Sequence, residues 1–374
     1  MNETQKNRFK PGLEGVIAAE TKLSRVDGQN GELIIAGYPL EEIAPTATFE
    51  AVVYLLWHGE RSKGDELDRF SQRIRDRHTL PKPLIDLLRA AAAQKVDPMD
   101  ALRIGAGAVD LDQSELTPEQ AAVLILSRLP TIVAAYDRLQ RGEEPIEPDK
   151  SLSLAANFLY MLFGNVPSQS QVRALETYFN TVIDHGLNAS TFATRVIIAT
   201  QSDMVSAVTG GIGALKGPLH GGAPGPALDM VFEIGSAERA ELVLREKLDR
   251  GERLMGFGHR VYKVRDPRAE VLGAAARRLY EEDGDMALYH LVQAVEEKAV
   301  ALLAEYKPGR NLQTNVEFYT ALLLHGLGLE ADLFSPTFAI ARAAGWMAHA
   351  FEQLETGRLI RPKASYVGPL NLVW

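Results

Sequence analysis

A histidine stands among four cationic side chains in the segment GFGHRVYKVRDPR, residues 256–268. The whole chain, in contrast, has a formal net charge of −9. A surface loop usually mixes its charges, so a local cluster of positive charge around His259 in an acidic protein favours a pocket for an anion. The segment therefore predicts a binding site for a small acid that carries two negative charges.

Three of the eight histidines in the chain differ from the rest in their surroundings. His185 lies in DHGLNAST, His220 in GPLHGGAPG and His259 in GFGHRVY. A glycine beside a functional side chain leaves room for a ligand to approach the backbone. Because His-Gly dipeptides are also common in turns, only the three together indicate a site. The other five fit helical patterns, and we expect them to be structural or on the surface: His58, His78, His290, His325 and His349.

Three arginines are candidates for binding the acid. Arg268 follows Asp-Pro, Arg361 precedes a proline, and Arg342 lies in the small and apolar run FAIARAAGWMA. An unpaired buried charge is very costly, so a guanidinium in such a run needs a partner. The sequence leaves two partners open for Arg342. One is an internal salt bridge, for example with Glu352, and the other is a forked, bidentate grip on a substrate carboxylate.

Other kinds of site are not indicated. GIGALKG lacks the glycine spacing of a dinucleotide-binding loop, and GALKGP lacks the Lys-Ser/Thr pair of a P-loop. No acidic or histidine cluster has the spacing of a metal site, and the absence of cysteine removes thiolate ligands and nucleophiles. We therefore expect no metal and no bound redox cofactor.

The negative charge of the chain argues against nucleic-acid binding. No apolar segment is long enough to span a bilayer, so we expect no membrane association and a cytoplasmic protein.

The elements that must position these residues are mostly helices. GVIAAETKLSRV and GELIIAGY flank the turn-rich DGQNG, which predicts a β-hairpin within residues 13–37. Beyond Pro39, apolar residues recur at spacings of three and four, which predicts ten or more helices and a mainly α fold. Glycine and proline gather in residues 209–226 and 255–268, where we expect loops and a hinge.

Five sequence blocks stand in the order found in citrate synthases. They are DHGLNASTF, GPLHGGAP, GFGHRVYKVRDPR, TNVEFY and RPKASYVG. The chain resembles this family from PGLEGV, near residue 11, to its last residues, and its length resembles that of the shorter prokaryotic members. The resemblance implies a large, dimer-forming helical domain of residues 1–218 and 323–374. It also implies a small helical domain, 219–322, that lies on the coenzyme A side and closes over the site.

The resemblance also implies an activity and a role for each matched residue. The family condenses acetyl-CoA with oxaloacetate and water to give citrate and coenzyme A, without a permanently bound cofactor. Three residues match its catalytic groups. His220 resembles the histidine that holds the thioester oxygen of acetyl-CoA, and His259 resembles the one that polarises the ketone of oxaloacetate. Glu317 stands at the position of the base that removes a methyl proton from acetyl-CoA. Four match the groups that bind the oxaloacetate carboxylates: His185, Arg268, Arg342 and, from the partner subunit of a homodimer or larger homo-oligomer, Arg361. Lys263 and Arg260 resemble parts of the coenzyme A site.

Position 317 departs from the family pattern, which usually has aspartate there. Both carboxylates have similar basicity, but the extra methylene of Glu317 moves the oxygens, and general-base catalysis depends first on position. We expect activity to be retained at a changed rate. For His220, we expect a place near a helix N-terminus, which would keep the imidazole neutral.

Two alternatives to citrate synthase activity stay open at this point. The first is a 2-methylcitrate synthase that uses propionyl-CoA, because one methylene changes binding by only about 1–3 kcal/mol. The second is a non-catalytic assembly protein, for which the glutamate at 317 is the sole support.

Overall fold

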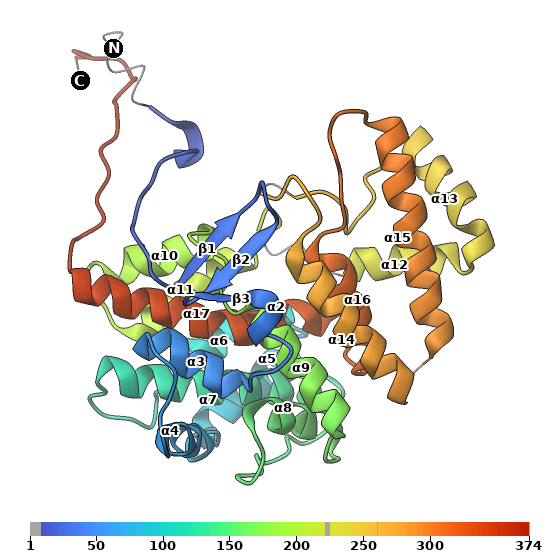
Figure 1. Ribbon diagram of the computed structural model, residues 1–374. Helices are drawn as coiled ribbons and strands as arrows, with labels where there is room; N and C mark the ends of the chain where they lie inside the picture. Colours follow the sequence, from blue (N-terminus) through green and yellow to red (C-terminus); the bar gives the residue numbers. More distant parts are fainter. Residues whose placement is uncertain (1–8, 221–224, 260, 284, 374) are drawn as a thin grey trace.

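Helices make up most of the protein. The computed structural model describes residues 9–220, 225–259, 261–283 and 285–373, and a three-stranded sheet is the main β element in this part of the chain. The prediction of a mainly α fold with ten or more helices is confirmed (Figure 1). The helices are α2 Leu40–Ile43, α3 Phe49–His58, α4 Glu66–Arg75, α5 Lys82–Ala93, α6 Pro98–Ala106, α7 Pro118–Gln140, α8 Leu154–Phe163, α9 Gln169–Val182, α10 Ala189–Ile198, α11 Met204–Leu215, α12 Gly225–Ile234, α13 Ala237–Asp249, α14 Pro267–Asp283, α15 Met286–Tyr306, α16 Val316–Gly326 and α17 Phe334–Thr356. None of the helices described here is both long and apolar enough to cross a membrane.

Two long helices, α7 and α17, form the centre of the larger group of helices. Helix α7 begins with a capping box in which Thr117 and Gln120 satisfy each other's backbone N–H groups. It is then buried continuously from residue 121 to 136, as expected for a helix that is apolar on most of its surface, and the buried Arg128 pairs with Asp112 at 2.6 Å. Helix α17 packs against α7, α9, α10 and α11. Because α9 and α10 flank the segment that contains His185, α17 is placed to meet that segment with its own side chains.

The N-terminal hairpin is shorter than the sequence predicts. Strands β1 (Ser24–Asp27), β2 (Glu32–Ile35) and β3 (Tyr38–Pro39) form an antiparallel sheet in that order. The side chain of Asp27 accepts hydrogen bonds from the backbone of Gln29 and Asn30 and so shapes the turn. The prediction of a strand from residue 15 to 23 is wrong. This segment has no neighbouring strand to pair with, and Ile17, within its β-branched pattern, is 88% exposed.

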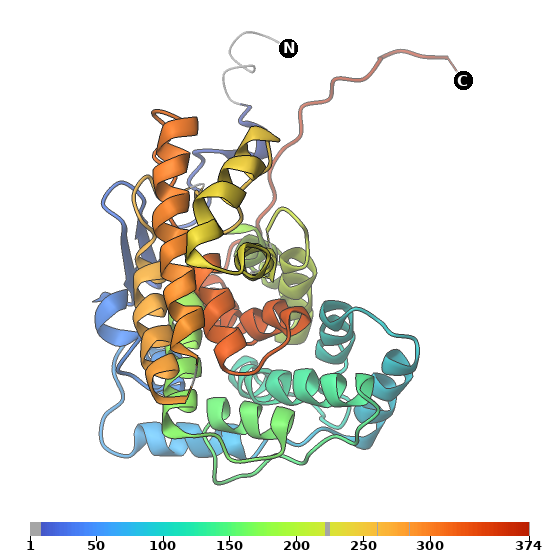
Figure 2. The same ribbon diagram turned by 90° about the vertical axis from the view of Figure 1, so that its right-hand side faces the viewer.

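Helices α12–α16 gather beside the larger group, on the right in Figure 1. Helix α14 packs against α16 and α15, and also against α9 and α2 of the larger group. The view in Figure 2 shows the same two groups from the side, with the last segment, residues 358–373, leaving the helical body. Helices α12–α16 fall largely within the predicted small domain, residues 219–322. The division into two domains at these boundaries stays a prediction.

Candidate active site

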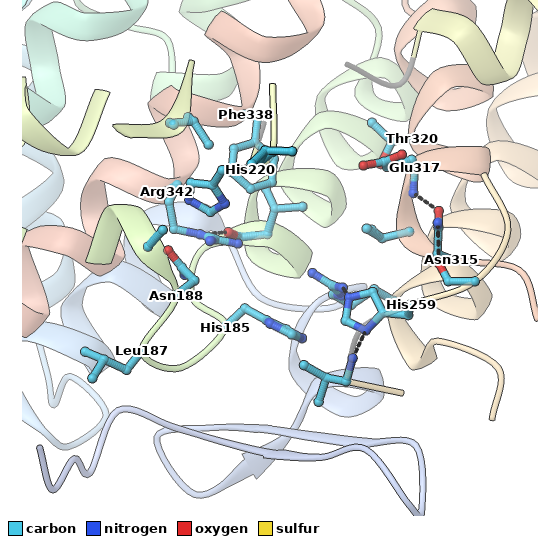
Figure 3. Close-up of a pocket in the computed structure, with 18 of the residues that line it drawn as sticks. His185, Leu187, Asn188, His220, His259, Asn315, Glu317, Thr320, Phe338 and Arg342 are labelled. Atoms are coloured by element: carbon cyan, nitrogen blue, oxygen red, sulfur yellow. Dashed lines mark hydrogen bonds between the residues drawn. The ribbon is translucent and has the colours of Figure 1, made fainter. Parts of the chain in front are cut away.

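One cavity brings together six of the residues predicted from the sequence. Its volume is about 990 Å³, and it lies where loops from the two groups of helices meet (Figure 3). The six predicted residues that line it are His185, His220, His259, Arg268, Glu317 and Arg342. The N-terminal segment, which is not part of the sheet, contributes residues 12–16 and Ala18 to the same wall.

Pairing between two loops brings His259 close to Glu317. Phe257 forms an isolated antiparallel bridge with Thr314. Asn315 donates its backbone N–H to the carbonyl of Gly256 at 3.0 Å and its side-chain amide to that of Gly258 at 2.9 Å. Both glycines have a positive φ, 86° and 84°, which non-glycine residues rarely adopt. The glycines that frame His259 therefore let this loop run along the start of α16.

The tip of the N-terminal hairpin supports the same loop from the other side. Lys263 donates its backbone N–H to the carbonyl of Gly28 at 2.8 Å. A Cβ atom at residue 28 would lie 2.3 Å from the carbonyl oxygen of Val261. Only glycine allows this approach, so the hairpin and the cationic loop are in direct backbone contact.

Arg268 is held by a buried acid that the sequence analysis did not select. Asp266 is 0% exposed, and it accepts hydrogen bonds from Nε and Nη2 of Arg268 at 3.0 and 2.8 Å. It also accepts the backbone N–H of Val316 at 3.2 Å, which ties α14 to the start of α16. Burial alone would lower the pKa of Arg268, but Asp266 raises it above its ordinary value. The guanidinium is thus permanently charged and fixed in direction.

His259 is a neutral hydrogen-bond donor in this arrangement. Its Nδ1 accepts the backbone N–H groups of Val261 at 3.1 Å and Tyr262 at 3.0 Å, so the neutral ring carries its proton on Nε2. Nε2 lies 3.3 Å from Nη2 of Arg268. Burial, and then the charge of Arg268, lower the pKa of His259 to about 4. Two neighbouring donors of this kind can converge on one acceptor, such as a carbonyl or carboxylate oxygen of a bound acid.

His185 lies beside His259 and is also kept neutral. Its Nε2 is 3.1 Å from the hydroxyl of Tyr262, and the two imidazole rings meet edge to face with 5.8 Å between centroids. Burial lowers the pKa of His185 well below its ordinary value, and the charges of Arg268 and Arg342 lower it further. The fixed positive charges of the described cavity wall are therefore guanidinium groups rather than imidazolium groups.

Arg342 is a buried cation without a carboxylate partner in the described part of the chain. It is 2% exposed, its Nε donates to the carbonyl of Val182 at 2.6 Å, and its guanidinium lies 4.6 Å from the ring centroid of Phe338. Burial lowers its pKa to about 10. A salt bridge with Glu352, one of the two possibilities for this residue, is wrong, because Glu352 pairs with Arg195 at 2.6 Å. The guanidinium borders the cavity and can grip a carboxylate from there.

His220 lies at the N-terminus of α10, as the sequence predicts. Its Nε2 accepts the backbone N–H of Ser190 at 3.2 Å and is 2.7 Å from the hydroxyl oxygen of the same residue. Ser190 is in the first turn of α10 and also accepts a hydrogen bond from Trp346 at 3.1 Å. The proton of the neutral ring is therefore on Nδ1. Burial, followed by the charge of Arg342, lowers the pKa of His220.

Glu317 occupies the first turn of α16, across the cavity from His220 (Figure 3). Its backbone N–H is capped by the side chain of Asn315 at 3.0 Å. Burial raises the pKa of the Glu317 carboxyl to about 7, although Arg268 and Arg253 oppose this change. A carboxylate of this basicity can accept a proton near neutral pH.

Two of the predicted residues, Lys263 and Arg361, lie outside the cavity wall, and a third has no described position. The Lys263 side chain is exposed and outside the lining. Arg260 lies outside the described residues. Arg361 is exposed on the segment that leaves the helical body after α17 (Figure 1). The coenzyme A role of Lys263 and Arg260 and the action of Arg361 across a subunit interface stay predictions.

Comparisons with known proteins agree on one family. Residues 12–363 match the family model described as "Citrate synthase, C-terminal domain". The citrate synthase of Haloferax volcanii is 43% identical over 97% of this chain and 97% of its own, and the 2-methylcitrate synthase of Mycobacterium tuberculosis is 40% identical over 96% and 91%. A solved ternary complex of Thermoplasma acidophilum citrate synthase with carboxymethyl coenzyme A and oxaloacetate has a TM-score of 0.88. It is 29% identical and covers 98% of each chain. On this evidence the chain belongs to the citrate synthase family.

Proposed function

We propose that the protein is a citrate synthase, which condenses oxaloacetate with acetyl-CoA and water to give citrate and coenzyme A. One observation supports this most strongly. A single cavity combines two buried guanidinium groups, three neutral imidazoles and a carboxyl group whose pKa is raised to about 7. The two guanidinium groups can bind the two negative charges of a small dianion, and the carboxylate can remove a weakly acidic proton.

Oxaloacetate binds between the guanidinium groups in this proposal. The forks of Arg268 and Arg342 each take a carboxylate, and His185 donates to the same acid once its bond with Tyr262 is exchanged. The ketone oxygen then lies against Nε2–H of His259. Fixing both ends of the acid orients the ketone carbon toward the acetyl group, which lowers the entropic cost of the bond-forming step.

The carbon nucleophile is formed by Glu317 and His220. The carboxylate of Glu317 takes one proton from the acetyl methyl group, and the electron pair of that C–H bond moves into the thioester to form an enolate. The charge on the enolate oxygen is stabilised by Nδ1–H of His220, which faces away from Ser190. A neutral donor is suitable, because it stabilises charge as the charge develops.

Condensation and hydrolysis complete the reaction. The enolate carbon attacks the ketone carbon, and the electron pair of the C=O π bond moves to the ketone oxygen, which takes the proton of His259 Nε2. Water then adds to the thioester carbonyl and gives one proton to the sulfur, so that the C–S bond breaks and coenzyme A leaves as its thiol. The proton on Glu317 returns to Nε2 of His259 by way of solvent, and the new carboxylic acid of citrate releases its proton to water.

The expectation of a loop over residues 209–215 is wrong, because they belong to helix α11. We propose that residues 219–322 close over the rest of the chain and bend after this helix, near residues 216–220, which would exclude water until the carbon–carbon bond exists. Lys263 and Arg260 would contact coenzyme A. We expect a cytoplasmic reaction, without a metal or permanently bound cofactor.

The first test measures release of coenzyme A with a thiol reagent. The chain has 0 cysteines, so the protein contributes no thiol signal of its own. We expect release that requires both substrates and a loss of on the order of 10²–10⁴ in kcat for Glu317→Gln. Wild-type protein without turnover would support the non-catalytic alternative. An active Glu317→Gln variant would instead remove the assignment of the base.

A 2-methylcitrate synthase is the second candidate, because the Mycobacterium tuberculosis relative with that name is 40% identical. The two reactions differ by one methylene of the acyl group, a difference worth about 1–3 kcal/mol in an apolar pocket. The ratio of kcat/KM for acetyl-CoA and propionyl-CoA decides between them. A higher value for propionyl-CoA would favour the second candidate.

We also propose a homodimer, or a larger homo-oligomer, in which Arg361 completes the partner's oxaloacetate site. In support, Arg361 is exposed, and so are the apolar side chains around it on this segment, including Leu359 and Tyr366 at 57% and 69%. Mixing two inactive variants, Arg361→Ala and Glu317→Gln, tests this. With random exchange of dimer subunits, half of the dimers each regain one intact site, so we expect about one quarter of wild-type activity. Absence of recovery after verified subunit exchange would contradict action across the interface.

A further inference from the structure

A buried acid–histidine pair lies directly behind the proposed oxaloacetate site. Asp184 and His349 are both 0% exposed, and Oδ1 of Asp184 lies 3.2 Å from Nε2 of His349. The two atoms are within ion-pair distance, but neither has a hydrogen bond of good geometry among the described residues; the other carboxylate oxygen of Asp184 accepts a hydrogen bond from the hydroxyl of Ser24. Leaving either group alone in the interior would be costly, so the stability of each depends on the other. The mechanism above uses neither residue.

The direction of the hydrogen in this pair follows from the group on the other side of the ring. Nη1 of Arg195 lies 3.1 Å from Nδ1 of His349. A guanidinium only donates, so Nδ1 accepts and the neutral ring carries its proton on Nε2, which faces Asp184. Arg195 is held by Glu352 at 2.6 Å. The imidazole is thus fixed from behind as a donor toward Asp184.

The pair is connected to Arg342 through the segment that follows α9. The carbonyl of Val182 accepts the Nε hydrogen of Arg342 at 2.6 Å. On the same helix as Arg342, a Cβ atom at Gly345 would lie 2.1 Å from the carbonyl oxygen of Ile183 and 3.2 Å from Oδ1 of Asp184. Helix α17 is therefore in backbone contact with residues 182–184, and His185 follows directly.

The charge of Asp184 acts on Arg342. Burial favours loss of the Arg342 proton, and the charge of Arg268 adds to this effect. Asp184 opposes both, with a smaller contribution from the buried Tyr178. In return, although burial raises the pKa of Asp184, His349 and then Arg342 bring it below its ordinary value.

We propose that Asp184 and His349 are positioning residues for oxaloacetate. Asp184 keeps Arg342 charged and the segment 182–185 in place, and the N–H of His349 keeps Asp184 ionised. The inference rests on the proposed function. It adds that affinity for the keto diacid depends on two groups that do not line its cavity.

The first variant removes only the charge. In Asp184→Asn we expect the KM for oxaloacetate to rise about tenfold at pH 7, because the segment 182–185 loses its ionised anchor while Arg342 stays charged, and we expect kcat/KM for acetyl-CoA at saturating oxaloacetate to stay within about twofold. The KM for oxaloacetate of the wild type rises in alkali as Arg342, with a pKa of about 10, loses its proton. In Asp184→Asn this rise begins at least about one pH unit lower, because the opposing charge is gone. A purely structural role for Asp184 does not move this profile.

A second pair of variants keeps or removes the donor at nearly constant size. His349→Gln retains an N–H near the position of Nε2, whereas His349→Leu does not. We expect the KM for oxaloacetate to rise about tenfold in the leucine variant and less than about threefold in the glutamine variant. His78 is the matched control, since it is 1% exposed and its Nδ1 bonds the carbonyl of Ser127 at 2.9 Å. The same changes at His78 lower the unfolding temperature without a selective effect on oxaloacetate.

The possible results separate this inference from the proposed function. A wild type that does not turn over acetyl-CoA and oxaloacetate refutes the proposed function. An active wild type, with folded Asp184→Asn and His349→Leu that keep its KM for oxaloacetate and its alkaline profile, overturns the positioning role alone. If Asp184→Asn does not fold, the contrast between His349→Gln and His349→Leu decides, and equal KM values in the two variants contradict the proposal.

Discussion

The raised pKa of Glu317 predicts how the reaction rate depends on pH. Burial of this carboxyl raises its pKa from an ordinary 4.5 to about 7, against the opposing charges of Arg268 and Arg253. A general base works only when ionised, so the rate follows the ionised fraction. With a midpoint near 7, this fraction increases from about one tenth at pH 6 to about nine tenths at pH 8. We therefore expect the rate to rise about tenfold over this range.

Bound oxaloacetate makes this increase in rate between pH 6 and 8 a lower limit. Its two negative charges disfavour ionisation of a nearby carboxyl and move the midpoint above 7. The imidazole of His259 has a pKa of about 4 in the unliganded protein, so it contributes no inflection of its own between pH 6 and 8. The rise in rate across this range is thus assigned to Glu317.

The assay is kcat/KM for acetyl-CoA at saturating oxaloacetate, measured by release of the coenzyme A thiol. Glu176 provides the control, because burial in the protein core also raises its pKa to about 7. Glu176→Gln removes that second titration, and we expect it to leave the activity profile unchanged. A rate that is constant from pH 6 to 8 would refute the reasoning, as would a midpoint near the ordinary 4.5 of a glutamate.

Three further perturbations test other parts of the structure. Arg342→Lys loses the planar fork and the bond to Val182, so the KM for oxaloacetate rises by on the order of 10- to 100-fold in steady-state kinetics; an unchanged KM would contradict the binding role. Glu176 has a folded-state pKa of about 7, above its ordinary 4.5, so its contribution to stability is complete below pH 4.5 and is lost as the pH rises through 7. Urea unfolding of Glu176→Gln therefore shows a gain over wild type that is absent near pH 4 and reaches on the order of 3 kcal/mol at pH 8; the opposite trend would refute the assignment. Gly28→Ala places a methyl group 2.3 Å from the carbonyl oxygen of Val261, so both the unfolding temperature and kcat fall, whereas Gly37→Ala, with nothing within 4 Å, affects kcat little.

The sequence was sufficient for the fold class because helical periodicity is a local signal. The same reasoning failed at residues 15–23, where a β-branched pattern is not matched by a pairing strand. Whether a strand forms depends on a neighbour that the sequence does not identify, and here the segment runs along the cavity instead. The hairpin itself was predictable, since its turn is encoded within five residues, 27–31.

For the site, the sequence located the groups that face the cavity but not those that hold them. Asp266, Ser190 and Tyr262 fix the directions of Arg268, His220 and His185. Asp266 had one local signal, an acid directly before the proline that opens α14. Ser190 is 30 residues from His220, so its role depends on tertiary packing. The partner of Glu352 was missed for the same reason, because Arg195 lies on a different helix.

The hairpin contact at Gly28 has a consequence for how the chain can be divided. A fragment that starts after the three strands would retain every arginine and histidine of the cavity wall and Glu317, yet the loop around His259 would lose the surface against which its backbone rests. The positive charge of this pocket belongs to the last half of the polypeptide, but its shape is completed by the first forty residues. Transplanting the catalytic segments onto another helical scaffold would therefore require the hairpin to be moved with them.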